Sequence, residues 1–295
     1  MPYKSVLRPD VFKDQIIIVT GGGSGIGRCI SHEVASLGAN VMLLGRTLSK
    51  LETVAAEIEE DGGRAECYTV DIRDDARVAE VIGEIVAKHK VIHGLVNNAG
   101  GQFPAPMEAI SKNGFEAVVK NNLVGGFLMA RETFKQSMKE NGGSIVNITA
   151  DCTNGFPNMA HTGAARAGME NLTKTAAWEW GGHGVRVNAV APGLIASSGF
   201  DTYTDVDFKK KFKKAHYSVP LKRLGNEAEI SAAVCFLLSP GAAYMSGDML
   251  QVDGGARFAA PHYHMPLGNT LATNSESFDG FHRYVKPSVL TEGDD

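Results

Sequence analysis

A glycine-rich turn near the start of this 295-residue chain has the composition of a phosphate-binding loop. Residues 20–27 read Thr-Gly-Gly-Gly-Ser-Gly-Ile-Gly and join an apolar run to an amphipathic segment. Glycines allow a tight turn and a close approach of the backbone to a pyrophosphate, whose charge is met by the N-terminus of the following helix. Because this turn follows a predicted strand and opens a predicted helix, we predict a dinucleotide site there. The expected contacts are Gly21, Gly23, Ser24, Gly25, Ile26 and Gly27.

The end of the second predicted strand indicates which dinucleotide is bound. Gly45-Arg46 stands where an NAD site would have an acidic residue that accepts a hydrogen bond from the ribose 2′-hydroxyl. A carboxylate would repel a 2′-phosphate, whereas the guanidinium of Arg46 can bind it through two hydrogen bonds and stack on the adenine. The sequence therefore favours NADP(H) as the cofactor.

Two other groups of polar residues are less specific. Lysines fill five of the six positions in 209–214 and could meet the phosphates of coenzyme A, although such a run is more often a solvated helix face. His262 and His264 have the spacing of a metal-binding pair, but no third ligand is in view, so we expect no metal.

The elements that must position these residues alternate along the chain. Near-continuous runs of Val, Ile and Leu are typical of strands covered on both faces. They cover 15–20, 40–44, 65–70, 91–96, 144–149, 185–190 and 249–252. Helical periodicity covers 26–37, 49–60, 74–88, 112–139, 163–180 and 227–238. Regular alternation with short connections predicts an α/β fold, a Rossmann-like doubly wound parallel sheet of about seven strands with helices on both faces.

No linker interrupts this pattern before residue 253, so we expect residues 1–255 to form a single dinucleotide-binding catalytic domain. Residues 194–220 form a long excursion after a strand, where α/β sheets carry their substrate loops. Residues 256–295 have no clear period and are expected to be a C-terminal tail. The tail is either loosely attached or an arm that covers a neighbouring subunit or the active site.

The composition excludes several classes of protein. With 43% hydrophobic and 21% charged residues, the chain is an ordinary globular protein and not a disordered one. Its net charge of -4 gives no general attraction for nucleic acid or anionic membranes. No signal peptide and no apolar run of about 18 residues is found, and the four cysteines are scattered. We expect a cytoplasmic protein with a small-molecule substrate, no nucleic acid partner and no membrane.

Several motifs together make residues 12–255 resemble the short-chain dehydrogenase/reductase superfamily. Besides the glycine-rich turn, they are Asn97-Asn98-Ala99-Gly100, Asn122, Pro192-Gly193 and Asp253-Gly254-Gly255. The resemblance implies an oxidoreductase with a nicotinamide cofactor that assembles as a homotetramer. It also implies cofactor contacts from Asp71, Ile72, Asn98, Ala99, Gly100, Arg166, Pro192, Gly193, Ile195 and Ser197.

The catalytic motif departs from the family pattern. The family uses a Tyr that donates a proton and, four residues later, a Lys that lowers the pKa of this Tyr and binds the ribose. Here Thr162 occupies the Tyr position and Arg166 the Lys position. A threonine hydroxyl is too weak an acid to replace a phenol. Arg166 cannot donate a proton near neutral pH, although its guanidinium can bind the ribose and supply positive charge to an oxyanion.

Within the superfamily, Gly100-Gly101-Gln102-Phe103 and the stretches 154–157 and 161–168 are similar to the peroxisomal trans-2-enoyl-CoA reductase branch and, less closely, to the 2,4-dienoyl-CoA reductases. These enzymes deliver hydride to a carbon conjugated to a thioester, so the developing charge is an enolate that hydrogen bonds can hold. Such chemistry tolerates the loss of the Tyr.

The same resemblance suggests an acid. In the mitochondrial dienoyl-CoA enzymes an acidic Tyr lies fifteen positions before the Lys, and that offset from Arg166 falls on Asp151. Asp151 could act as an acid if burial raised its pKa; otherwise it pairs with Arg166 or caps a loop. His161 is an adjacent candidate acid, but a His at a helix entry is more often structural. The expected catalytic residues are Asn122, Asp151, Thr162, as a hydrogen-bond donor to the enolate, and Arg166. The expected substrate contacts are Gln102, Phe103, Phe156, Tyr203 and Tyr217.

These assignments predict an NADP(H)-dependent oxidoreductase that transfers hydride to the C=C bond of an enoyl- or dienoyl-CoA thioester. One alternative is an alcohol/aldehyde dehydrogenase for an apolar, terpenoid-like substrate. Another is a non-reducing NADP-bound enzyme or a nucleotide-binding protein, because the Tyr/Lys pair is replaced by Thr162 and Arg166. The lysines of 209–214 favour the CoA thioester.

Overall fold

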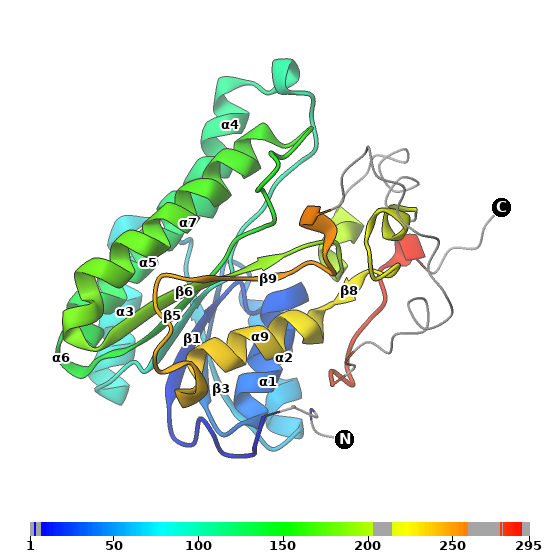
Figure 1. Ribbon diagram of the computed structural model, residues 1–295. Coiled ribbons are helices and arrows are strands. Elements are labelled where there is room, and N and C mark those ends of the chain that lie inside the picture. Colours follow the sequence, from blue (N-terminus) through cyan, green and yellow to red (C-terminus); the bar gives the residue numbers. More distant parts are fainter. Residues whose placement is uncertain (1–2, 4–6, 203–213, 259–277, 279, 291–295) are drawn as a thin grey trace.

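A seven-stranded parallel sheet runs through the molecule in the order β3-β2-β1-β4-β5-β6-β9 (Figure 1). The computed structural model describes residues 3, 7–202, 214–258, 278 and 280–290. The strands are β1 (Ile16–Thr20), β2 (Asn40–Gly45), β3 (Arg64–Thr69), β4 (Gly94–Asn97), β5 (Gly143–Ile148), β6 (Val185–Pro192) and β9 (Met249–Val252). The predicted doubly wound parallel sheet is confirmed, and its order reverses between β1 and β4.

Helices cover both faces of the sheet (Figure 1). One face carries α1 (Gly25–Ser36), α2 (Leu48–Glu60) and α9 (Glu227–Leu238). The other carries α3 (Asp75–His89), α4 (Lys112–Val119), α5 (Gly125–Thr133), α6 (Lys139–Asn141) and α7 (Ala160–Trp180). The two layers explain the unbroken apolar runs of the strands. In β1, Ile17 and Val19 pack into the core on the α1 side, while Ile16 and Ile18 pack into the core on the α3 side.

Short elements complete the chain. A two-stranded parallel pair, β7 (Ile195–Ala196) with β8 (Gly225–Asn226), brings the segment after β6 beside the N-terminus of α9. The 3-10 helices are η1 (Met107–Ala109), η4 (Gly181–His183), η5 (Ser198–Thr202), η6 (Ala215–Ser218), η7 (Pro240–Ala242), η8 (Ala256–Phe258) and η9 (Ser288–Leu290). Among the described helices, none combines the length and apolar content needed to cross a bilayer.

The helix predicted over 112–139 is present but not continuous. Two π-helical turns, η2 (Lys120–Val124) and η3 (Phe134–Met138), interrupt it. Asn122 lies in η2, where its Nδ2 donates hydrogen bonds to the carbonyl of Val118 (2.9 Å) and to that of Gly101 (2.6 Å). The side chain thus competes with the backbone for the bonds that an α-helix would make, which explains the wider turn.

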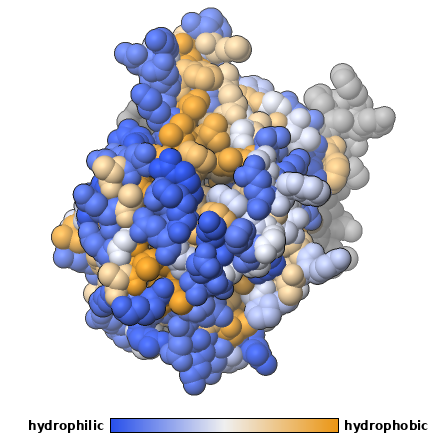
Figure 2. All heavy atoms as spheres, turned by 90° about the vertical axis from the view of Figure 1, so that its left-hand side faces the viewer, coloured by the Kyte–Doolittle hydropathy of each residue, from blue (hydrophilic) through white to orange (hydrophobic). Residues whose placement is uncertain are grey.

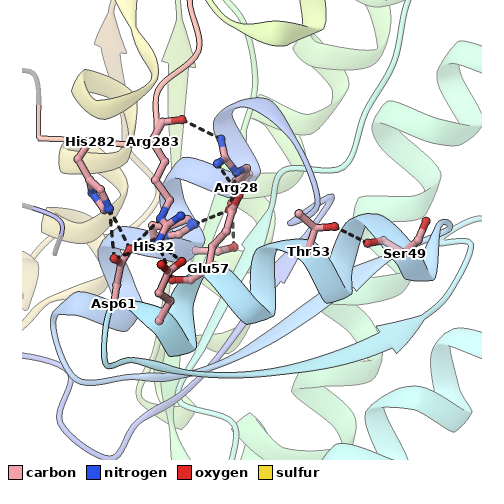
Figure 3. Close-up of polar contacts among 11 residues, drawn as sticks. Arg28, His32, Ser49, Thr53, Glu57, Asp61, His282 and Arg283 are labelled. Atoms are coloured by element: carbon pink, nitrogen blue, oxygen red, sulfur yellow. Dashed lines mark hydrogen bonds and ion pairs between the residues drawn. The ribbon is translucent and has the colours of Figure 1, made fainter. Parts of the chain in front are cut away.

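The described part of the predicted tail docks on α1 and α2 of its own chain. Figure 3 shows His282 and Arg283 pointing toward Asp61, with His32 and Glu57 beside it. Arg283 forms ion pairs with Asp61 (3.1 Å) and with Glu60, and its carbonyl accepts a hydrogen bond from Arg28 (3.1 Å). The neighbouring ring of Phe281 is only 1% exposed and lies under the Arg28 guanidinium.

The same segment also contacts the start of the predicted substrate loop. The hydroxyl of Tyr284 donates a hydrogen bond to the carbonyl of Ala196 (3.1 Å). Both the backbone N–H and the hydroxyl of Ser288 donate to Asp201 (2.9 and 2.6 Å). Residues 280–290 therefore connect α1 and α2 to the segment that follows β6. The other tail residues, 259–277, 279 and 291–295, lie outside the described part of the chain, as do His262 and His264.

The face of the molecule that carries α4, α5 and α7 exposes several large apolar side chains. Figure 2 shows apolar residues gathered in the upper half of this face, with smaller patches below. The exposed apolar residues of these helices and of η2 are Phe115, Val124, Phe127 and Trp178, and the indole of Trp178 is 89% exposed. Clustered apolar exposure of this kind is typical of a surface that another protein covers.

Candidate active site

A cavity of about 670 Å³ opens at the carboxyl ends of the strands, where the sheet order reverses. Its walls are the segments that follow β1, β2, β3, β4, β5 and β6. This edge is where open α/β sheets bind their ligands. Every residue that the sequence predicts to contact the cofactor, from Gly21 to Ser197, lines this cavity.

The glycine-rich turn brings the start of α1 against the end of β4. A Cβ atom on Gly27 would lie 2.3 Å from the carbonyl oxygen of Gly21 and 2.4 Å from Nδ2 of Asn98, so only glycine fits there. Thr20, which the sequence did not single out, ties the same region together. Its Oγ1 accepts hydrogen bonds from the N–H groups of Asn98 and Ala99, both at 3.0 Å. The position of Thr20 directly before the glycines is the sequence feature that could have indicated this structural role.

This cradle fits the pyrophosphate of a dinucleotide. Ser24 is the N-cap of α1, but its side chain makes no capping hydrogen bond. The first N–H groups of α1 therefore face the cavity without that cap, and the helix dipole adds positive potential. A negatively charged group with several acceptor oxygens matches these donors.

At the far end of the cavity, two cations follow β2. The exposed Arg46 lines the wall, and Lys50 in the first turn of α2 lines it too. The sequence did not single out Lys50, although its spacing of four residues from Arg46 was a usable signal. Asp71 also lines this end, and its carboxylate accepts from both the backbone and the guanidinium of Arg73. Those hydrogen bonds lower the pKa of Asp71 to about 2.

The guanidinium of Arg166 forms the inner wall. The residue is 9% exposed, and Nη1 donates a hydrogen bond of 2.6 Å to the carbonyl of Ile148. Nε has no hydrogen-bond partner within the described structure. A Cβ atom on Gly100 would lie 2.7 Å from Nη2, so the missing side chain at Gly100 leaves room for this group. Burial lowers the pKa of Arg166 to about 10, which still leaves it charged at neutral pH.

Asp151 lies on the same wall as Arg166. Its backbone N–H donates to the carbonyl of Pro192 (3.2 Å), which continues the β5–β6 pairing and fixes the residue at the cavity. Its Oδ1 is buried and has no hydrogen-bond partner among the described residues. No ion pair between Asp151 and Arg166 forms in the described part of the chain, where Arg166 binds the carbonyl of Ile148 instead.

Asn122 supports the wall from behind. It is 2% exposed and does not itself line the cavity. Its Oδ1 accepts a hydrogen bond from the N–H of Gly101 (3.2 Å), and its Nδ2 donates to the carbonyl of the same residue. Asn122 therefore fixes the backbone that carries Gly100 and Gln102, two lining residues.

Thr162 is farther from the cavity than Arg166. It is fully buried and is not among the lining residues. Its N–H donates a hydrogen bond to Nδ1 of His161 (2.8 Å), and its Oγ1 lies 3.2 Å from the same nitrogen. Burial lowers the pKa of His161, which favours the neutral ring. With Nδ1 accepting, the ring proton belongs on Nε2, which has no partner in the described structure.

The predicted substrate contacts separate into three groups. Gln102 and Phe156 line the cavity. Phe103 does not, and instead packs edge to face against His161 with ring centroids 4.5 Å apart. Tyr217 is 67% exposed and is not a lining residue. Tyr203 and the lysines of 209–213 lie outside the described residues.

The beginning of the tail also reaches the cavity. Ala256 is a lining residue, and Asn154 donates a hydrogen bond to the carbonyl of Arg257 (2.9 Å). The sequence did not indicate this contact, because residues 154 and 257 belong to separate loops.

Comparison with known proteins finds relatives that cover most of the chain. Residues 21–257 match a family model described as enoyl-(acyl carrier protein) reductase. Peroxisomal 2,4-dienoyl-CoA reductase of Mus musculus is 35% identical over 263 residues, which are 88% of this chain and 89% of that protein.

Solved structures agree with this match. The citronellol catabolism dehydrogenase of Pseudomonas aeruginosa PAO1 is 55% identical, with a TM-score of 0.78, over 86% of this chain and all of that one (100%). A structure assigned as an NAD(P)-dependent gluconate 5-dehydrogenase of Beutenbergia cavernae contains NADP at low occupancy. It is 33% identical, with a TM-score of 0.78, over 84% of this chain and 99% of that one.

Proposed function

We propose a function that proceeds from one premise: the chain belongs to the short-chain dehydrogenase/reductase family, whose members are oxidoreductases that use NAD(P)(H). Within that family, we propose that it is an NADP(H)-dependent reductase of the C=C bond in enoyl- or dienoyl-CoA thioesters. The observation that carries this proposal is the inner wall of the cavity. It holds the buried guanidinium of Arg166, Asp151 lines the same cavity, and no tyrosine lines the described cavity.

The chemistry of the two acceptors explains why this wall favours a C=C bond. When bound, a reduced nicotinamide supplies a hydride. Hydride addition to a ketone makes an alkoxide, a strong base that needs an acid in place at once. Addition to a carbon conjugated with a thioester puts the negative charge on the thioester oxygen as an enolate, which a fixed cation can stabilise. Arg166 is charged at neutral pH and cannot give up its proton, so it suits the second task.

The other residues take supporting roles in this proposal. Asp151 is the proton donor that completes the reduction, supported by its place on the wall and its unpartnered Oδ1. Asn122 positions Gly101 and thereby the neighbouring wall. Thr162 lies one helical turn from Arg166, where its hydroxyl is within hydrogen-bond distance of Nδ1 of His161. Gln102 and Phe156 contact the substrate.

NADP(H) is the cofactor that we propose, and the support is that the two cations after β2 line the end of the cavity and can bind a 2′-phosphate. The relative with bound NADP supports the choice. We assign the catalytic unit to residues 1–255 and regard 256–295 as a tail that supports it. The apolar face over α4, α5 and α7 supports a homotetramer, which light scattering of the purified protein would test.

The proposed activity is tested with NADPH and a panel of trans-2-enoyl-CoA and 2,4-dienoyl-CoA thioesters. We expect loss of the nicotinamide absorbance with at least one thioester and a much slower loss with ketones of similar size. Asp151→Asn should lower turnover, with a matched control at Asp248, an acidic residue remote from the cavity lining. If NADPH binds but no thioester is reduced, the proposal fails.

A second candidate is supported by a different observation. The citronellol catabolism dehydrogenase shares 55% of its aligned residues with this chain, more than the dienoyl-CoA reductase does. The alternative is an alcohol/aldehyde dehydrogenase for an apolar terpenoid-like substrate, with Asp151 accepting the alcohol proton. Incubation with NADP⁺ or NAD⁺ and citronellol separates the candidates, since a dehydrogenase would generate reduced cofactor. Reduction of thioesters without oxidation of citronellol would exclude the alternative.

A further inference from the structure

Glu227, the first residue of α9, is a buried carboxylate directly behind the cradle for the pyrophosphate. It is 4% exposed and does not line the cavity. A Cβ atom on Gly25, in the glycine-rich turn, would lie 3.8 Å from Oε1 of Glu227 and 3.6 Å from Oγ of Ser198. The carboxylate therefore lies close enough to the turn for a side chain at position 25 to contact it, and it is not part of the cavity lining.

Glu227 also binds the segment that follows β6, which forms another wall of the cavity. The backbone N–H of Ser198 donates a hydrogen bond to its carboxylate. The two residues that flank Ser198, Ser197 and Gly199, both line the cavity. The pairing of β7 with β8 brings this segment to the start of α9. One carboxyl group thus lies near the turn at the start of α1 and binds the segment after β6.

The charged and titratable groups around Glu227 do not neutralise it. From α1, Arg28 faces it, but that guanidinium forms two 2.8 Å hydrogen bonds to Glu57 and a third to the carbonyl of Arg283. Cys29 also faces it from α1. The other titratable groups of this α1–α9 contact are Tyr3, Glu33 and Cys235. Burial raises the pKa of Glu227 to about 7.

We propose that Glu227 is a positioning residue that couples cofactor binding to proton uptake, because its carboxyl group binds a proton when a pyrophosphate occupies the N-terminus of α1. The inference rests on the dinucleotide site of the proposed function. Two negative charges at the glycine-rich turn disfavour the carboxylate, so the neutral form is favoured in the complex. The neutral carboxyl still has an oxygen that accepts from Ser198, so the segment after β6 keeps its position.

The test is isothermal titration calorimetry of the full-length protein with NADPH at pH 7.5 in PIPES and in Tris, neither of which contains phosphate. The difference in heat between buffers of different ionisation enthalpy gives the number of protons exchanged. We expect the wild type to take up a fraction of a proton, and its Kd to rise by up to tenfold per pH unit above neutrality. The 2′-phosphate of NADPH has its second pKa near 6 and stays ionised in this range.

Glu227→Gln should abolish the proton uptake and flatten the pH dependence of Kd. Glu227→Met serves if the amide disturbs folding, and the exposed Glu52→Gln is the matched control that should behave as wild type. Equal proton uptake in the wild type and the folded Glu227 variants would overturn the inference while leaving the dinucleotide site intact. Failure of the wild type to bind NADPH or NADH at any pH would instead overturn the proposed function.

Discussion

Replacing Glu227 by glutamine should stabilise the cofactor-free protein at alkaline pH. Burial raises the pKa of this carboxyl from 4.5 in the unfolded chain to about 7 in the folded one. Between those values the folded state binds more protons than the unfolded state, so its stability falls as pH rises. Below pH 4.5 both states are protonated and the carboxyl has no such effect. Above pH 7 the wild type has lost about 3 kcal/mol, at roughly 1.4 kcal/mol per pH unit of the shift.

Urea unfolding of the wild type and Glu227→Gln at pH 5 and pH 8.5 measures this effect. The difference in unfolding free energy between the two proteins should change by about 2 to 3 kcal/mol in favour of the variant between these pH values. The exposed Glu52→Gln should show no such change. A difference between Glu227→Gln and the wild type that is the same at both pH values would refute the account of Glu227 as a buried carboxylate with a raised pKa.

Three further predictions address the site and the tail. Gly100→Ala should reduce the steady-state rate about 100-fold, because the added Cβ would lie 2.6 Å from Oδ1 of Asn122 and 2.7 Å from Nη2 of Arg166, and misplacement of a reacting group by about 1 Å has that effect. Gly182→Ala, with open space around it, should leave the rate unchanged. Arg46→Ala should weaken NADPH binding at least tenfold and NADH binding little, as measured by calorimetry; equal losses would argue against a 2′-phosphate contact. Removing residues 278–295 exposes the pocket that Phe281 fills and should lower the unfolding free energy by about 3 kcal/mol or more, measured in urea.

The sheet, its helices and the cofactor cavity were accessible from the sequence because each depends on local patterns. Strands covered on both faces are apolar at every position, as in Ile16–Thr20, so their runs stand out. The glycine-rich turn and Arg46 sit next to the strand ends that position them. The edge of a parallel sheet then brings such residues together without further information.

What the sequence did not indicate depends on contacts between distant segments. The π turn at Asn122 goes with the hydrogen bonds of its side chain to Val118 and Gly101, which nothing in the helical periodicity reveals. Thr162 and Arg166 lie one helical turn apart, and this spacing suggested that both face the cofactor. Arg166 reaches the wall because its side chain is long, while the short side chain of Thr162 meets His161. Glu227 reads as an ordinary acidic residue at a helix start until the fold buries it.

Arg166 stands where the family pattern has a lysine, and this difference affects the pH dependence of catalysis. In the family pattern, a phenol and an ammonium group determine the ionisation of the site together. Here burial lowers the pKa of Arg166 only to about 10, so its side chain stays almost fully charged from pH 5 to 8. Any change of activity over that range must come from other groups. Glu227 lies behind the cofactor cradle and would alter cofactor affinity. A pH profile at saturating cofactor therefore removes the contribution of Glu227.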